Sequence, residues 1–259
     1  MSTMPEDSLA SLYLVSIARQ MRSEDIIHVG AAQPEVWQAA EVARLLWAPG
    51  LRVVAAGTYH LTATLGGDPD LLASRTYGRD VVARREATLS QTHVFDDLHR
   101  VRVVFAGAMQ VDSCGNGNLI GFESRGRFIR GPGSAGLSTL TSFSDRFFFA
   151  LPRHTPSVLV DRVHRISVLG DPSTRERLGM CAGALQEVIT PMASFRSNGR
   201  TLSLSSIASG LDLESVQRAT GFEVQVADDL KVRDRLSAEE LAALRHVREM
   251  TNRRRSHEG

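Results

Sequence analysis

The spacing of apolar and polar positions predicts helices and strands in alternation near the start of the chain. Residues 8–21 place apolar side chains at helical spacing and predict an α-helix. Residues 25–29 form a short apolar run, which predicts a β-strand ended by Gly30. Pro34 suits the first turn of a helix, where its missing N–H costs nothing, so we expect a second helix from there to Trp47.

Two further apolar runs extend this order. Residues 51–56 (LRVVAA) predict a strand closed by Gly57, and residues 101–105 predict a buried strand. Strand–helix–strand order favours the α/β class, with an open, mostly parallel sheet and helices on both faces. Residues 57–92 show only weak patterns, and residues 94–100 predict a short helix.

The second half of the chain predicts a hairpin between further strands. Residues 157–160 and 185–189 are expected to be strands of the sheet. Residues 193–195 and 201–204 flank an Asn-Gly pair, Asn198-Gly199, which is typical of a tight β-hairpin turn.

Two helices are predicted near the C-terminus. Asp212 is expected to cap a short helix that ends near Gly221. Ser237 and Glu240 have the spacing of a capping box, so the last helix is expected to start there and to run to about Met250.

Composition places the chain among ordinary globular proteins, with 42% hydrophobic and 23% charged residues. We expect one α/β domain over residues 1–251, followed by a disordered polar tail over residues 252–259. A net charge of +1 gives no overall attraction to nucleic acid or to an anionic membrane. The start of the chain lacks the features of a secretory signal, and no apolar run is long enough to span a bilayer, so we expect a cytoplasmic protein.

The basic residues are almost all arginines, and the chain has only two cysteines. Lys231 is the only lysine, so arginine supplies nearly all positive charge. This bias reflects either a GC-rich genome or phosphate recognition, for which the planar guanidinium is suited. The two cysteines, Cys114 and Cys181, indicate neither a disulfide framework nor a zinc site.

Residues 107–118 (GAMQVDSCGNGN) form the first candidate site. A strand that ends in a glycine-rich turn is where open α/β sheets bind ligands. Gly107 allows close approach of the backbone to a ligand. The side chains of Gln110, Asp112 and Asn118 can either contact a substrate or brace the turn, and both interpretations stay open.

Residues 130–136 (RGPGSAG) form the second candidate site. Backbone N–H groups of such a loop can bind an anion or form an oxyanion hole, although a plain connecting loop has the same composition. The candidate binding residues in it are Gly133, Ser134, Ala135 and Gly136. Arg130 beside them is a candidate for binding phosphates or a substrate carboxylate.

The two motifs together resemble a known family. Residues 107–118 are similar to the G-A-x-Q-V-D-x-x-G-N-x-N signature of the β-subunit of class I CoA-transferases, of the glutaconate CoA-transferase type. Residues 132–136 are similar to the P-G-x-x-G loop of that subunit, and the resemblance extends over about residues 8–226. It implies a CoA-transferase fold, an acyl-CoA substrate, no cofactor beyond the CoA of that substrate, and an α-subunit partner in a heterodimer or heterotetramer.

The resemblance also reveals a missing group. In family transferases the strand at residues 51–57 ends in a glutamate that attacks the thioester. Residues 53–58 here read VVAAGT and contain no carboxylate, thiol or serine. Thr58 would need an adjacent base to act as a nucleophile, and His60 can serve as an acid or base or can simply pack in the protein.

The missing glutamate favours cleavage of a C–C bond over CoA transfer. Two branches of the family, a steroid-ring-opening CoA hydrolase and a glutaconyl-CoA decarboxylase-like enzyme, imply retro-Claisen ring opening or decarboxylation. CoA transfer between carboxylic acids, or a non-catalytic subunit that only binds CoA thioester, are the alternatives. A ligand-sensing domain of a transcriptional regulator is disfavoured, because no DNA-binding helix pair precedes the domain and the arginines form no single basic stripe.

Overall fold

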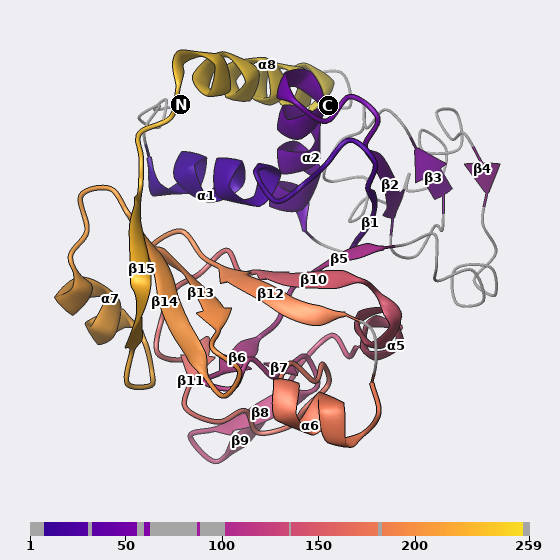
Figure 1. The fold of residues 1–259 in the computed structure, drawn as a ribbon. Helices are drawn as coiled ribbons and strands as arrows, with labels where there is room; N and C mark the ends of the chain where they lie inside the picture. Colours follow the sequence, from indigo (N-terminus) through magenta and orange to yellow (C-terminus); the bar gives the residue numbers. More distant parts are fainter. Residues whose placement is uncertain are drawn as a thin grey trace. The chain divides into compact units, whose positions relative to one another are not determined.

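The computed structural model describes residues 8–30, 33–55, 60–62, 87–88, 102–134, 136–180 and 183–255. Their contacts divide the chain into two compact units (Figure 1). Unit 1 comprises residues 1–105 and 235–259, and unit 2 comprises residues 106–234. The single domain expected over residues 1–251 stays a prediction. The helix expected over residues 94–100 lies outside the described residues.

The described part of unit 1 contains helices and parallel and antiparallel strands of a sheet. Its elements are α1 (Leu9–Ala18), β1 (Ile26–Val29), α2 (Pro34–Leu46), β2 (Arg52–Ala55), β3 (His60–Thr62), β4 (Ala87–Thr88), β5 (Val103–Ala106) and α8 (Ala238–Arg255). The strand order is β5-β1-β2-β3-β4. Strands β5, β1 and β2 are parallel, whereas β3 and β4 are antiparallel to their neighbours. The helices and strands expected before residue 57 are confirmed.

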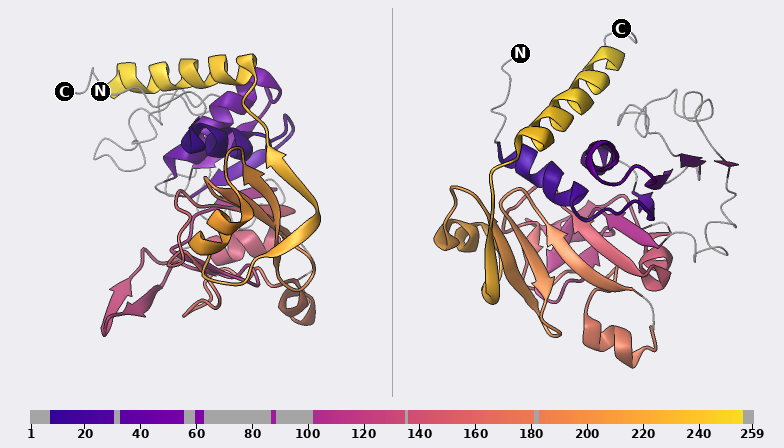
Figure 2. Two further views of the ribbon diagram at one scale, coloured as in Figure 1. Left: turned by 90° about the vertical axis from the view of Figure 1, so that its left-hand side faces the viewer. Right: turned by 45° about the horizontal axis from the view of Figure 1, so that its top comes forward.

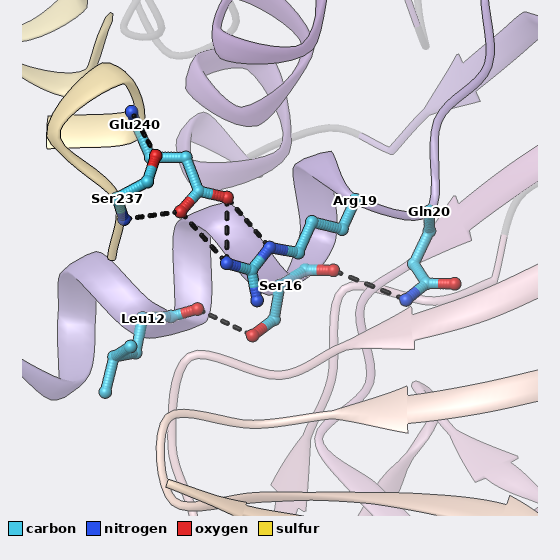
Figure 3. A network of polar contacts seen from close by, with 6 residues as sticks. All are labelled: Leu12, Ser16, Arg19, Gln20, Ser237 and Glu240. Carbon is cyan, nitrogen blue, oxygen red and sulfur yellow. Dashed lines mark hydrogen bonds and ion pairs between the residues drawn. The ribbon is translucent and has the colours of Figure 1, made fainter. Parts of the chain in front are cut away.

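The start of α8 confirms the predicted capping box (Figure 3). The backbone N–H of Glu240 donates to Ser237 Oγ over 3.1 Å, and the backbone N–H of Ser237 donates to Glu240 Oε2 over 2.9 Å. Arg19 at the end of α1 donates from Nε and Nη2 to the two oxygens of the same carboxylate, each over 2.9 Å. Glu240 therefore both caps α8 and joins its first turn to α1.

The end of α8 corrects one prediction. The helix continues to Arg255, so residues 252–255 are helical and not part of a disordered tail. Neither glycine nor proline occurs in the chain between Met250 and Arg255, and arginine is a good helix former. A polar composition alone therefore does not end a helix.

Unit 2 contains the remaining elements. They are β6 (Gln110–Asp112), β7 (Gly117–Asn118), β8 (Gly121–Ser124), β9 (Arg127–Arg130), α5 (Leu137–Phe143), β10 (Arg146–Ala150), β11 (Leu159–Val160), α6 (Pro172–Arg177), β12 (Ala184–Ile189), β13 (Ala193–Ser197), β14 (Leu202–Ala208), α7 (Leu213–Ala219) and β15 (Gln225–Arg233). The sheet strands of this unit follow one another in the order β15-β14-β13-β12-β10. A small sheet has the order β11-β6-β7, and β8 pairs with β9 alone.

Several predictions in unit 2 are confirmed. Strands β13 and β14 form the expected hairpin, in which Asn198 N–H donates to Thr201 O over 2.9 Å and Gly199 has a φ of 94°. Asp212 Oδ1 accepts from the backbone N–H of Ser215 over 2.8 Å and caps α7 as expected. The strand expected over residues 157–160 shortens to the two residues of β11.

Some elements of unit 2 have no counterpart among the predictions. Strand β10 is a buried run of phenylalanines, whereas β15 is polar and mostly exposed. The hairpin of β8 and β9 extends from the rest of unit 2, and all of β9 is exposed (Figure 2, left).

The predicted class is confirmed, since the protein is an α/β protein with parallel strand pairs and helices between them. Antiparallel pairs within the sheet make it mixed. No helix among the described residues has the length and apolarity needed to cross a membrane.

Candidate functional site

Gln110 and Asn118 lie opposite each other on the antiparallel strands β6 and β7. Asn118 Nδ2 donates to Gln110 Oε1 over 2.9 Å, and Nδ1 of the exposed His164 lies 3.3 Å from the same oxygen. Gln110 is only 3% exposed. Within the described part of the chain, both contacts use its carbonyl oxygen and none uses its amide nitrogen. The amide is thus held in one orientation, with two N–H donors available for a substrate oxygen.

Asn118 also stabilises the backbone at the start of β8. Its Oδ1 accepts from the backbone N–H groups of Ile120 and Gly121, over 3.0 and 3.2 Å. Its Nδ2 also donates to Gly121 O over 2.9 Å. The side chain is fully buried and its oxygen and nitrogen are both engaged, so Asn118 acts on the site by holding Gln110 and the backbone.

Asp112 braces the turn between β6 and β7. Its Oδ1 accepts from the backbone N–H groups of Cys114 and Asn116, over 3.1 and 2.8 Å. Its Oδ2 accepts from Asn116 Nδ2 and from the backbone N–H of Val163, each over 3.3 Å. Burial raises the pKa of the Asp112 carboxyl, while these hydrogen bonds act in the opposite direction. Of the two interpretations of Asp112, the contacts within unit 2 support the bracing role.

The glycines of the first motif differ in what they contribute. Gly115 has a φ of 83°, in the left-handed region that favours glycine. Gly117 is needed for packing instead, because a Cβ there would lie 2.5 Å from the Phe149 ring. Gly107 follows β5 at intermediate exposure.

The second motif is tied to the segment before β8. The backbone N–H of Gly131 donates to Ile120 O over 2.8 Å, and that of Gly133 donates to Leu119 O over 2.9 Å. Gly133 also has a φ of 85°. The N–H groups of Ser134 and Gly136 make no backbone hydrogen bond within the described residues. The loop therefore offers these two donors rather than a complete cradle, and α5 follows it.

Of the other predicted site residues, the structure describes some and leaves others outside the described ranges. Arg130 ends the exposed strand β9. His60 starts β3 and pairs with Thr88 of β4. Thr58 and Ala135 lie outside the described residues. The structure thus brings Gln110 and Asn118 together and attaches the glycine loop beside them through Leu119 and Ile120, all within unit 2.

His164 is the residue of this site that the sequence did not reveal. It follows β11 in a loop, and its ring lies 5.9 Å from that of Phe122, centroid to centroid. No motif links residue 164 to residue 110, and only the pairing of β11 with β6 brings the two segments together. No group of three or more His, Cys, Asp or Glu side chains suited to a metal ion occurs among the described residues.

The buried His154 connects two separate segments of unit 2 through its two ring nitrogens. His154 Nδ1 lies 2.7 Å from Thr190 Oγ1, and its Nε2 lies 3.0 Å from Thr220 Oγ1. Burial, and then the nearby Arg233 charge, lower the pKa of His154 to about 4. Burial alone lowers the pKa of His28 in unit 1 to about 4 as well. Both side chains are therefore neutral at pH 7.

These two histidines predict a loss of stability in mild acid. An unfolded histidine has a pKa of about 6.5, so below that pH the unfolded chain binds protons that the folded chain does not. Stability is fully present above pH 6.5 and falls as the pH approaches 4, by about 2 kcal/mol per histidine between pH 7 and 5. Urea unfolding at pH 7, 6 and 5 measures this slope. His154→Gln should remove about half of it, and an unchanged slope would contradict the assignment.

Comparison with known proteins gives the site its context. No protein-family profile matches the chain. The β-subunit of 3-oxoadipate CoA-transferase from Pseudomonas knackmussii is 23% identical over 254 residues, with 94% of each chain covered. The crystal structure of the decarboxylase AibA/AibB matches with a TM-score of 0.78 and 25% identity, over 92% of this chain and 94% of that one. Glutaconate CoA-transferase from Acidaminococcus fermentans matches with a TM-score of 0.76 and 19% identity, over 94% of each chain.

These comparisons confirm the resemblance of the chain to the β-subunit of class I CoA-transferases. The solved structures confirm the predicted CoA-transferase fold.

Proposed function

We propose that this chain is the β-subunit of a heteromeric enzyme that cleaves a C–C bond in an acyl-CoA thioester, by hydrolysis or by decarboxylation. The observation that carries the proposal lies at the end of β2. Residues 53–58 contain two alanines and a glycine where family transferases have their nucleophilic glutamate. Alanine cannot form the mixed anhydride on which CoA transfer in this family depends.

Two of the comparisons support this proposal. AibA/AibB, which has the same fold over almost the whole chain, is a decarboxylase. The curated relative is itself a β-subunit, which supports an α-subunit as the partner of this chain. That partner would complete the active site and supply further catalytic groups.

The chemistry of C–C cleavage needs hydrogen-bond donors more than a nucleophile from this chain. When the bond breaks, its electron pair stays on the carbon next to the thioester, whose carbonyl oxygen takes up the negative charge as an enolate. The carbon then accepts a proton, and the other fragment leaves as CO₂ or, after addition of water, as a carboxylate. Donors at the enolate oxygen lower the barrier. Gln110 Nε2 and the N–H groups of Ser134 and Gly136 are the donors that we propose within unit 2. Gly107 and Arg130 are the residues that we propose for binding the CoA part. His60 stays the acid–base candidate of the sequence, with Thr58 two positions before it.

Gln110→Met is expected to lower kcat by about 100-fold, the cost of removing one oxyanion donor. KM should change little, because the donor acts mainly on the charge that develops in the transition state. Steady-state kinetics of the complex measure both constants. His164→Ala is the matched control, since it removes a neighbour of Gln110 Oε1 but no N–H of the amide. An equal loss of kcat in both variants would contradict the donor role, because His164→Ala keeps both N–H groups of the Gln110 amide.

A trapping experiment tests the missing nucleophile. The complex with the α-subunit is incubated with acyl-CoA thioesters and reduced with borohydride, which converts an enzyme-bound glutamyl thioester to an alcohol. The intact mass of this chain should not change. Glutaconate CoA-transferase from Acidaminococcus fermentans, treated in the same way, is the positive control. A mass change on this chain would overturn the proposal.

CoA transfer is the second candidate function, and the curated relative favours it, because that protein is a 3-oxoadipate CoA-transferase. It requires a nucleophile that residues 53–58 do not offer in the usual form. The trapping experiment separates the two candidates directly, since only transfer through an anhydride leaves a reducible thioester on the chain.

A further inference from the structure

The β8–β9 hairpin is an arm of unit 2 that pairs with no other strand of the described residues. It forms a two-stranded sheet of its own and extends from the rest of the unit (Figure 2, left). Its register is regular, from Gly121 opposite Arg130 to Ser124 opposite Arg127. An isolated two-stranded hairpin is only marginally stable in water, because no further strand or helix covers its side chains. Such a hairpin is stabilised when a partner covers it.

Large apolar side chains are exposed on both faces of this hairpin. Residues directly opposite each other in an antiparallel pair share a face. Ile129 therefore lies with Phe122 on one face, and Phe128 lies with Glu123 on the other. Phe128 is 45% exposed and Ile129 is 42% exposed, and Ile120 just before β8 is exposed as well. Apolar groups gathered in this way at a projecting segment mark an interaction site.

Arginines without acidic partners surround these apolar groups. The hairpin segment, residues 119–130, and the neighbouring loop, residues 161–166, together carry five arginines and two acidic residues. The loop contacts the hairpin, since the Arg165 guanidinium lies 5.6 Å from the centroid of the Phe128 ring. All five arginines are exposed, and none forms an ion pair with a described residue. The whole chain has a net charge of only +1, so this positive charge is local.

The tip of the hairpin carries an arginine where its turn favours another residue. Arg125 and Gly126 are the two turn residues, with φ angles of 50° and 72°. A two-residue turn with positive φ at both positions favours asparagine or glycine at the first. Any other residue in this left-handed region costs about 1 kcal/mol. The Arg125 side chain has no partner among the described residues that offsets this cost, which indicates a contact with another molecule.

The base of the hairpin is joined to the candidate site. Asn118, which orients the Gln110 amide, also holds the backbone N–H groups of Ile120 and Gly121. The N–H of Gly131, just after β9, donates to Ile120 O. A chain that binds the hairpin therefore lies next to this site. The proposed function, on which this inference rests, requires an α-subunit to complete the site.

We propose that the β8–β9 hairpin, with Arg162 and Arg165 beside it, is the surface through which this chain binds its α-subunit. The complementary surface is a groove with apolar walls and acidic residues along its rim. The exposed Phe128 and Ile129 supply affinity, while the arginines orient the partner and accelerate association. Carboxylates are the groups that pair best with guanidinium ions in proteins. A phosphate ligand alone would leave the apolar groups on both faces of the hairpin uncovered.

Biolayer interferometry with the CoA-transferase α-subunit of the same organism tests this surface. Acyl-CoA is left out, so that a change in substrate binding does not affect the result. Ile129→Ser and Arg127→Glu should each weaken binding of the α-subunit at least about tenfold. For Arg127→Glu the difference from the unmodified chain should shrink as salt rises from about 0.05 to about 0.5 M, because salt screens exposed charges. Unchanged binding in both variants would overturn the proposal.

Unit 2 offers a matched control for each of these variants. Leu213 at the start of α7 is 43% exposed, so Leu213→Ser removes an apolar group of similar exposure. Arg200 is exposed in the turn between β13 and β14, and its side chain has no partner within the described residues. Leu213→Ser and Arg200→Glu should each change α-subunit binding less than about twofold. Losses as large as those of the hairpin variants would also overturn the proposal.

Arg125→Asn separates docking from folding. Asparagine suits the turn better than arginine, so the urea midpoint of this chain should stay the same or rise. Binding of the α-subunit should nevertheless fall about threefold or more, because a charge at the tip is lost. A lower midpoint with unchanged binding would contradict the proposal, since Arg125 would then serve only the hairpin itself.

The same experiment distinguishes failure of this inference from failure of the proposed function. If the unmodified chain bound no α-subunit, both the heteromeric enzyme and the docking surface would be wrong. If the unmodified chain bound the α-subunit and the hairpin variants bound it equally well, only the docking surface would be wrong.

Discussion

Asp112→Ala is expected to lower the free energy of unfolding by about 3–5 kcal/mol. Its two oxygens accept hydrogen bonds from three backbone N–H groups and one side-chain amide, all within the turn after β6 or the segment that packs on it. Alanine leaves these buried donors unpaired, and each such donor costs about 1–3 kcal/mol. Activity is expected to fall as well, because the same turn leads into β7 and Asn118.

Urea unfolding, monitored by far-UV circular dichroism, measures the effect of this variant. Asp161→Ala is the control, because Asp161 is an exposed aspartate in the segment next to the same turn. It should change the free energy of unfolding by less than about 0.5 kcal/mol. A loss below about 1 kcal/mol for Asp112→Ala would show that water replaces the carboxylate and that the bracing role is wrong.

Arg175→Met is expected to cost a similar amount, about 3–5 kcal/mol. Arg175 is 4% exposed and donates to three backbone carbonyls from separate segments. These are Leu169 O over 2.9 Å, Thr141 O over 3.2 Å, and Gly183 O. Its guanidinium also lies 5.5 Å from the centroid of the Phe147 ring. Methionine keeps the apolar stem of this side chain but pairs none of the carbonyls.

The same unfolding experiment tests Arg175, with Arg177→Met as the control. Arg177 lies on the same helix, α6, but is exposed, and its contact to Thr174 Oγ1 is made at the surface. Its replacement should have an effect below about 0.5 kcal/mol. Equal effects of the two substitutions would mean that burial of Arg175 has no energetic consequence in unit 2.

The sequence predicted those elements whose local signals agree with their environment. Ser237 and Glu240 predicted the start of α8 correctly, because a capping box acts within one turn. Asn198-Gly199 likewise predicted its hairpin. The end of α8 was predicted too early, because arginines near Arg255 are polar but still favour helix. Strand β15 has no apolar alternation and is held by pairing with β14, which no local pattern reveals.

The candidate site shows the same division between local and distant information. The motif over residues 107–118 correctly located the turn. Asp112 accepts from the backbone N–H of Cys114, two residues further along the chain, so this contact is local in sequence. His164 reaches Gln110 only through the pairing of β11 with β6, over a separation that the sequence does not report. The exposed side chains of the β8–β9 hairpin are equally invisible in the sequence, because exposure is a property of the folded protein.

Product analysis of the assembled enzyme tests the central claim most directly. The chain is co-expressed with the CoA-transferase α-subunit of the same organism, and a panel of acyl-CoA thioesters is added with and without acetate. Mass spectrometry then identifies every CoA ester that forms. We expect products that have gained water or lost CO₂ while CoA stays on the acyl group, independent of acetate. Formation of acetyl-CoA at the expense of the acyl-CoA would contradict the account, because it would require a nucleophile that residues 53–58 do not provide in the usual form.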